Sequence, residues 1–212
     1  MSKKVLILSG SPRNGGNSDI LCDEFMKGAK EAGNEVEKIR VAAKKIAPCI
    51  ACYYCRNNDG KCAIKDDMAE ILDKMLEADV IVMASPVYFY SIDAQLKAVI
   101  DRAVAKWTKI KNKEFYYIMT AAEDSDTVMD CTLECMRGFA ICLDNSKEMG
   151  IIYGKGVYEA GAIKNTPYMK EYGIKCIDER NRKNEKNIIN FNDFGICRIF
   201  NDSLFCGRKH KQ

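Results

Sequence analysis

The sequence predicts an α/β protein built on a doubly wound, five-stranded parallel sheet with strand order 2-1-3-4-5. Two observations lead to this prediction. Short apolar segments alternate with amphipathic segments of helical spacing over residues 1–155. Strands that are separated by helices form parallel sheets covered on both faces, and right-handed crossovers then wind such a sheet outward from its first strand.

Five segments have the length and the turn boundaries of strands. The first, Lys4–Ser9, is an apolar run that ends at Gly10 and Pro12, as a buried strand does. The other four strands are expected at Glu35–Arg40, Val80–Ala84, Phe115–Thr120 and Gly150–Tyr153.

Four segments between these strands have the apolar spacing of amphipathic helices. In the first of them, Ile20, Leu21 and Phe25 fall on one face, and Gly33 marks the end. The helices are expected at Ser18–Ala32, Asp66–Ala78, Ile92–Lys106 and Asp126–Leu143.

Length and composition are those of a globular protein with a sizeable core. The chain has 212 residues, of which 47% are hydrophobic and 30% are charged. It contains no apolar run of the length that a membrane-spanning helix needs, and its apolar N-terminal run is too short for a signal peptide. Eleven cysteines without such a signal indicate a reducing compartment, so the expected location is cytoplasmic.

The charge distribution separates the last forty or so residues from the rest. The net charge of +3 falls entirely within residues 171–212, where nine Lys and Arg face six Asp and Glu. A mildly basic tail is weak evidence for nucleic acid, and no basic-aromatic alternation occurs elsewhere. Neither nucleic acid nor a membrane is therefore expected as a partner. Residues 1–170 are predicted to form one domain, and residues 171–212 a divergent tail outside the conserved fold.

A cysteine-rich segment at residues 48–66 is the feature least expected by chance. Four thiols fall within fourteen residues, and the turn residues of Asn57–Gly60 let the chain double back between the last two. Thiolates at such spacing can converge on one metal centre, and the compact run resembles ferredoxin spacing more than the two separated knuckles of zinc sites. We expect an iron–sulfur cluster, with zinc or no metal as alternatives, on Cys49, Cys52, Cys55 and Cys62.

The loop after the first strand has the chemistry of a phosphate site. It contains Ser11, Arg13, Asn17 and Ser18 and opens directly into a helix, whose N-terminus offers free N–H groups to an anion. It lacks the Gly-Lys-Ser/Thr ending of nucleoside triphosphate sites and the G-x-G-x-x-G of dinucleotide sites. The loop is therefore expected to hold one terminal phosphate; an ordinary glycine-rich turn with a serine cap is the alternative.

Two further loops follow strands at the same edge, where ligands of doubly wound sheets bind. Ser85–Ser91 contains three consecutive aromatic residues, which suit a flat heteroaromatic ring or, alternatively, a partner subunit. Thr120 ends the fourth strand and Ala121 follows it, and both are small enough to let a ring approach the backbone.

Together these segments resemble the flavodoxin-like NAD(P)H-dependent FMN reductase superfamily and, within it, the iron–sulfur flavoprotein group. The resemblance covers about residues 1–170. It rests on Gly10–Arg13 with Gly16–Ser18, on Pro48–Cys62 with Asp66–Met68, and on Ser85–Tyr88. It implies a flavodoxin-like fold with a cysteine-rich insertion, and a homodimer or homotetramer with the flavin near a subunit interface.

The resemblance also implies the roles of individual residues. The FMN phosphate would be held by Ser11, Arg13, Asn17 and Ser18. The isoalloxazine would be lined by Pro86, Val87, Tyr88 and Phe89 and completed by Thr120 and Ala121. A [4Fe–4S] cluster would be bound by the four cysteines, which follow the second strand and are expected near the carboxyl edge of the sheet.

The expected function is an FMN-dependent oxidoreductase that moves electrons between a reduced nicotinamide, NADH or NADPH, or ferredoxin and a small acceptor. The flavin performs the chemistry, so no catalytic acid or base is expected in the protein. Two other classes stay open: a flavin and iron–sulfur electron carrier without substrate turnover, and a zinc-binding module of the same fold.

Overall fold

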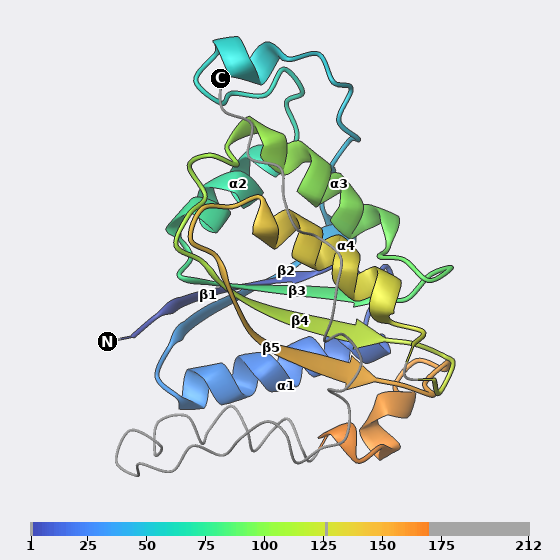
Figure 1. The fold of residues 1–212 in the computed structure, drawn as a ribbon. Coiled ribbons are helices and arrows are strands. Elements are labelled where there is room, and N and C mark those ends of the chain that lie inside the picture. Colours follow the sequence, from blue (N-terminus) through green and yellow to red (C-terminus); the bar gives the residue numbers. More distant parts are fainter. Residues whose placement is uncertain (1, 126, 170–212) are drawn as a thin grey trace, which may run out of the picture. The chain divides into compact units, whose positions relative to one another are not determined.

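The sheet has the predicted flavodoxin-like topology. The computed structural model describes residues 2–125 and 127–169 of the chain, and all five strands pair in parallel in the order β2-β1-β3-β4-β5 (Figure 1). The strands are β1 (Lys4–Ser9), β2 (Glu35–Arg40), β3 (Val80–Pro86), β4 (Glu114–Thr120) and β5 (Lys147–Gly154).

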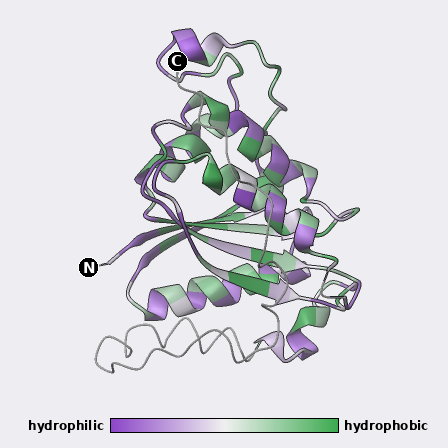
Figure 2. Ribbon diagram, in the orientation of Figure 1, coloured by the Kyte–Doolittle hydropathy of each residue, from purple (hydrophilic) through white to green (hydrophobic). Residues whose placement is uncertain are grey.

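Helices cover both faces of the sheet. One face is covered by α1, and the other by α2, α3 and α4 (Figure 1). Each helix has both hydrophobic and hydrophilic residues, as amphipathic packing requires (Figure 2). Their bounds are α1 (Asn17–Glu31), α2 (Met68–Glu77), α3 (Ala94–Arg102) and α4 (Asp130–Ile141).

The two central strands are buried on both sides, which explains their uninterrupted apolar sequences. Along β1, Val5 and Ile7 pack in the core under α1, whereas Leu6 and Leu8 pack in the core of the opposite face. This alternation follows from the two-residue period of a strand. The covered faces therefore leave the edges of the sheet, rather than its faces, for ligands.

Several predicted boundaries differ from the structure by a few residues; the helix expected at 126–143, for example, spans Asp130–Ile141. Two of these differences have local reasons. The helix expected at 92–106 ends at Arg102 and continues as a 3-10 turn, η3 (Ala103–Ala105). The last strand begins at Lys147, three residues before the predicted start at Gly150. The prediction missed these three residues because they are exposed and have no apolar pattern. A register shift at Phe115 accommodates this irregular start.

Strand register brings three loops together at the carboxyl edge of the sheet. Gly10, after β1, donates a backbone hydrogen bond to the Ala84 carbonyl of β3, at 2.8 Å. Val87, after β3, donates to the Thr120 carbonyl of β4, also at 2.8 Å. The loops that the sequence singled out are thus adjacent.

Among residues 2–125 and 127–169, no helix is long and apolar enough to span a membrane. The predicted tail, residues 171–212, lies outside the described residues, so its separation from the domain stays a prediction.

Candidate functional site

The loop between β1 and α1, residues 10–16, forms the first part of the site. Gly16 caps α1 without any side-chain hydrogen bond to the first helical N–H groups. The hydroxyl of Ser18 is buried and has no hydrogen-bond partner among the described residues. A Cβ on Gly16 would stand 3.1 Å from the Ser11 hydroxyl. Free N–H groups, a hydroxyl without a partner and a close-fitting glycine are what a bound phosphate requires.

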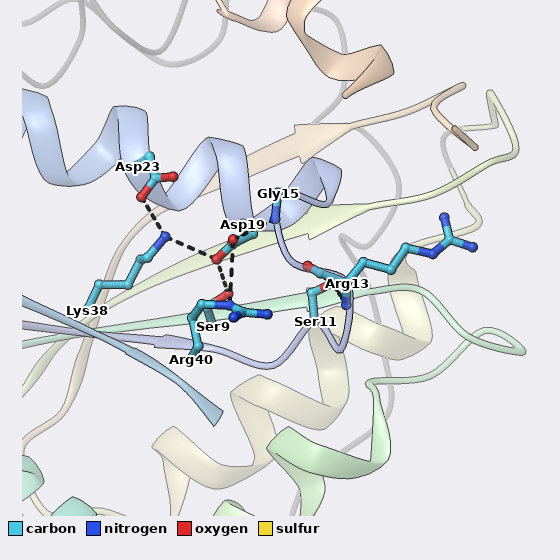
Figure 3. Close-up of polar contacts among 8 residues, drawn as sticks. All are labelled: Ser9, Ser11, Arg13, Gly15, Asp19, Asp23, Lys38 and Arg40. Atoms are coloured by element: carbon cyan, nitrogen blue, oxygen red, sulfur yellow. Dashed lines mark hydrogen bonds and ion pairs between the residues drawn. The ribbon is translucent and has the colours of Figure 1, made fainter. Parts of the chain in front are cut away.

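A buried ionic network supports this loop from below. Asp19 accepts hydrogen bonds from the Ser9 hydroxyl at 3.0 Å, the Gly15 backbone N–H at 3.1 Å and Lys38 Nζ at 3.0 Å (Figure 3). Burial alone would raise the pKa of Asp19, but the hydrogen bonds from Lys38, Gly15 and Ser9 hold it below its usual value. Asp19 therefore stays charged and fixes the loop at Gly15.

Sequence reasoning missed this role of Asp19. The available signal was its place in the first turn of a helix, where an acid is favourable, directly after Ser18.

Two predicted phosphate residues use their side chains elsewhere. Asn17 donates to the backbone carbonyls of Val157 and Glu159 at 3.2 and 2.9 Å. Arg13 donates to the Tyr158 carbonyl at 3.0 Å. Both therefore hold residues 157–159 against the loop. This leaves Ser11, Ser18 and the first N–H groups of α1 as the donors best placed for a phosphate.

The aromatic loop after β3 is a strained, exposed turn. Tyr88 and Ser91 exchange two backbone hydrogen bonds, of 2.9 and 3.0 Å. Between them Phe89 and Tyr90 adopt left-handed backbone angles, with φ of 49° and 60°, as in a type I′ turn. Glycine and asparagine usually occupy such positions, and Phe89 is fully exposed. Strain retained in an apolar, exposed loop is typical of binding sites.

The other predicted ring residues surround the base of this turn. Pro86 and Val87 are half-buried, while Thr120 and Ala121 are buried beneath the loop at the end of β4.

A buried acid joins the phosphate loop to the aromatic loop. Asp93 caps α3, accepts from the Leu96 N–H at 2.8 Å and accepts from the Ser85 hydroxyl at 2.8 Å. Burial raises its pKa. A Cβ on Gly10 would stand 2.3 Å from the Asp93 carboxylate, so only glycine lets the two loops meet here. Sequence analysis overlooked Asp93, although an Asp directly before a helix is a common cap.

The four cysteines lie along one loop. Cys49 and Cys52 are exposed, Cys55 and Cys62 are half-buried, and all four are free thiols. Among residues 2–125 and 127–169, no three Cys, His, Asp or Glu side chains converge as metal ligands. The donor set, four thiols at ferredoxin-like spacing, still fits an iron–sulfur cluster by its chemistry.

This loop is fastened to the far end of α3. Arg102, the last residue of that helix, bonds to Asp66 through both terminal nitrogens, at 2.8 and 2.9 Å. Burial would lower the pKa of Arg102, but Asp66 and Cys62 beside the guanidinium raise it. Because α3 begins at the aromatic loop and is about 13 Å long, the cysteine segment does not lie at the carboxyl edge, where the sequence placed it. Figure 1 shows it at the opposite end of α3.

Comparison with known proteins agrees with this arrangement of loops. A family model described as NADPH-dependent FMN reductase matches residues 3–129. The chain belongs to the NADPH-dependent FMN reductase family. Within the matched region lie the phosphate loop, the cysteine segment, the aromatic loop and the end of β4.

Its relatives include iron–sulfur flavoproteins. One from Methanocaldococcus jannaschii is 49% identical over 47% of this chain and 51% of its own length. Another from Methanosarcina thermophila is 43% identical over 52% of this chain and 59% of its own length. The chain thus spans about half the length of these two relatives. A second Methanocaldococcus jannaschii iron–sulfur flavoprotein is 31% identical over 83% of this chain and 87% of its own length.

Solved structures share the fold. An NAD(P)H:quinone oxidoreductase from Methanothermobacter marburgensis has a TM-score of 0.66 at 15% identity, covering 88% of this chain and 98% of that one. An azoreductase from Bacillus anthracis has a TM-score of 0.66 at 16% identity, covering 84% and 100%. At such low identity these likenesses show the fold alone.

Proposed function

We propose that this FMN reductase family member is an FMN-dependent oxidoreductase that passes electrons between NADH, NADPH or ferredoxin and a small acceptor. The observation that supports it most is the buried Ser18 hydroxyl at the start of α1, which has no hydrogen-bond partner among the described residues. The strained aromatic loop follows β3 at the same edge of the sheet. A phosphate group would accept a hydrogen bond from the Ser18 hydroxyl, and a flat ring would pack against the aromatic loop.

The residues divide into a phosphate group and a ring group. The phosphate would be held by Ser11, Ser18 and the first N–H groups of α1, with Arg13 and Asn17 holding the neighbouring segment in place. The ring would lie against Pro86, Val87, Tyr88, Phe89, Thr120 and Ala121. When bound, FMN accepts hydride and passes electrons on singly or in pairs. The protein positions the ring, and no side chain is assigned as acid or base.

The cysteine segment adds a one-electron site to this proposal. Cys49, Cys52, Cys55 and Cys62 would ligate a [4Fe–4S] cluster, because four thiols in fourteen residues supply its full ligand set. Such a cluster exchanges electrons singly. We further propose a homodimer or homotetramer in the cytoplasm, since Phe89 and Tyr90 are exposed beside the ring site and a second copy would cover them.

Stopped-flow reduction tests the proposed activity. The FMN-loaded protein, free of oxygen, would be mixed with NADH, NADPH or reduced ferredoxin while the flavin absorbance is followed. Bleaching by one of these donors, followed by recovery on addition of a quinone, is the expected result. Bleaching by dithionite alone, with none of the three donors active, would contradict the proposed enzyme and favour an electron carrier.

A further inference from the structure

Arg102 is one of the most completely buried large side chains of the described residues, with a relative exposure of 2%. It terminates α3, and its guanidinium reaches the base of the loop that contains the four cysteines. One terminal nitrogen donates to the Ala47 carbonyl at 2.8 Å, and the other lies 3.4 Å from the Ile64 carbonyl. Both nitrogens also bond to Asp66.

These acceptors stand on either side of the cysteines. Ala47 precedes Cys49 by two residues, and Ile64 follows Cys62 by two residues. Asp66 reinforces the closure, because its carboxylate also accepts from the Ala47 N–H at 2.9 Å. One planar cation therefore joins the two ends of the loop, a geometry suited to the rigid fork of arginine and not to lysine.

The loop has a second attachment to the same end of α3. Gly60 packs so closely on the Ala105 carbonyl that a Cβ would stand 2.6 Å from it. Asp59 forms an ion pair with Lys109 at 2.6 Å. The turn between Cys55 and Cys62 is thus held in place as well as the base.

One donor of Arg102 is left over. Its Nε is buried and has no hydrogen-bond partner among the described residues, although buried N–H groups nearly always have one. Cys62 lies within electrostatic reach of the same guanidinium. A sulfur atom on the thiol side of the loop would satisfy this donor.

We infer that Arg102 is a positioning residue for an iron–sulfur cluster on the cysteine loop: it closes the loop at its base and offers its remaining N–H to sulfur. This inference rests on the proposed ligation of a cluster by the four cysteines. Arg102 has no role in the proposed flavin site. Its contacts with the Ala47 and Ile64 carbonyls go beyond what an ion pair with Asp66 requires.

The test compares Arg102→Lys with Arg137→Lys in the full chain, reconstituted with iron and sulfide without oxygen. Lysine at 102 keeps the charge and can reach Asp66 but lacks the fork and the Nε. Arg137, on α4, is the control, because it makes a two-nitrogen contact with Glu148 of β5 at 2.7 and 2.8 Å. Bound FMN, iron per chain, the rate of iron release to a chelator and the cluster midpoint potential are measured.

We expect Arg102→Lys to bind FMN as the wild type does but to release iron roughly 10–100-fold faster, the range typical of residues that support metal ligands. Its cluster potential becomes more negative, because hydrogen bonds to cluster sulfur favour the reduced state. Arg137→Lys matches the wild type in the rate of iron release and in the cluster potential. A residue that only stabilised the fold would change FMN binding and leave the potential unaltered.

Release and potential equal to those of Arg137→Lys would overturn the inference while leaving the proposed cluster intact. A wild-type protein that holds FMN but no iron would instead refute the proposed cluster and this inference with it. If Arg102→Lys does not fold, Asp66→Asn takes its place, since it keeps Arg102 and its carbonyl contacts but removes the charged partner. Iron release no faster than in Arg137→Lys would then count against the inference.

Discussion

Ser18 is the residue on which the proposed flavin site depends most directly. Its hydroxyl is buried at the start of α1 and lacks a partner among the described residues. Ser146 provides a close comparison, because its hydroxyl is likewise buried without a partner but precedes β5, at the opposite edge of the sheet. Replacing either serine removes a buried hydroxyl without a partner, but only Ser18 is proposed to contact FMN. Comparing the two variants therefore isolates the effect on ligand binding.

We predict that Ser18→Ala weakens FMN binding roughly 10–100-fold, because a hydrogen bond to a charged group contributes about 1.5–3 kcal/mol. Ser146→Ala leaves FMN affinity unchanged. Titration of apoprotein with FMN, followed by flavin fluorescence, measures both. Equal affinities for the two variants would show that Ser18 does not contact the phosphate.

Asp19 supplies a pH dependence of known sign. Its folded pKa is depressed by Lys38 and by the Ser9 and Gly15 donors, so it stabilises the fold above its unfolded pKa of about 3.9 and loses this contribution as the pH falls through the folded value. Asp19→Asn should lower the free energy of unfolding at pH 7 by about 3 kcal/mol, as breaking a buried pair does.

Urea unfolding at pH 7 and pH 3 checks this expectation. The difference between Asp19→Asn and the wild type should shrink at the lower pH, because pH 3 is below the unfolded pKa of about 3.9, so that unfolding takes up a proton. A difference that stays constant with pH would show that the carboxylate charge is not what stabilises the loop.

At the scale of elements, the site depends on two loops, after β1 and after β3, that approach each other more closely than side chains normally allow. Gly10 of the phosphate loop lies directly against Asp93, the cap of α3. The next loop turns through Phe89 and Tyr90 in left-handed angles. Both features cost stability locally, and both keep the two loops adjacent at the carboxyl edge of the sheet.

Gly10→Ala should destabilise the fold by about 1–3 kcal/mol, because the new methyl group would overlap the Asp93 carboxylate. Gly138→Ala is the control: Gly138 lies within α4, and beyond its chain neighbours and the backbone of its own helix no heavy atom stands within 4 Å of a Cβ placed there. Alanine at 138 should stabilise by about 0.5–1 kcal/mol, through helix propensity alone. Urea unfolding measures the free energy of unfolding of both variants. A change of the same sign in the two would refute this account of Gly10.

Replacing Phe89 and Tyr90 together by Asn and Gly should raise thermal stability, because each residue in the left-handed region costs about 1–2 kcal/mol that the new pair avoids. The same change should slow reduction of bound FMN, because two aromatic rings are lost beside it. Thermal unfolding and stopped-flow reduction measure the two effects. Faster or unchanged reduction would mean that the rings have no part in the site.

For the whole molecule, sequence reasoning recovered the strand order and the adjacency of the loops, because the buried strands β1 and β3 have continuous apolar sequences that end in turn residues. It could not place the cysteine segment. That placement depends on Arg102, whose contacts with Ala47 and Asp66 join residues distant in sequence. The contacts of Asn17 with the Val157 and Glu159 carbonyls were equally hidden, because no local pattern specifies them.

As a unit, the fold connects the two proposed redox sites through α3. A rigid sheet edge holds the proposed flavin loops, and α3 connects them to the cysteine loop through Asp93 at one end and Arg102 at the other. The distance between the two proposed redox centres within one chain is thereby fixed by a helix of nine residues.

The most direct test of the central claim is the absorbance spectrum of the full chain purified without oxygen and incubated with FMN, iron and sulfide. We predict flavin bands together with a broad iron–sulfur shoulder that dithionite bleaches. Cys52→Ala should lose the shoulder and keep the flavin bands. A protein that stays colourless after this treatment would contradict the account.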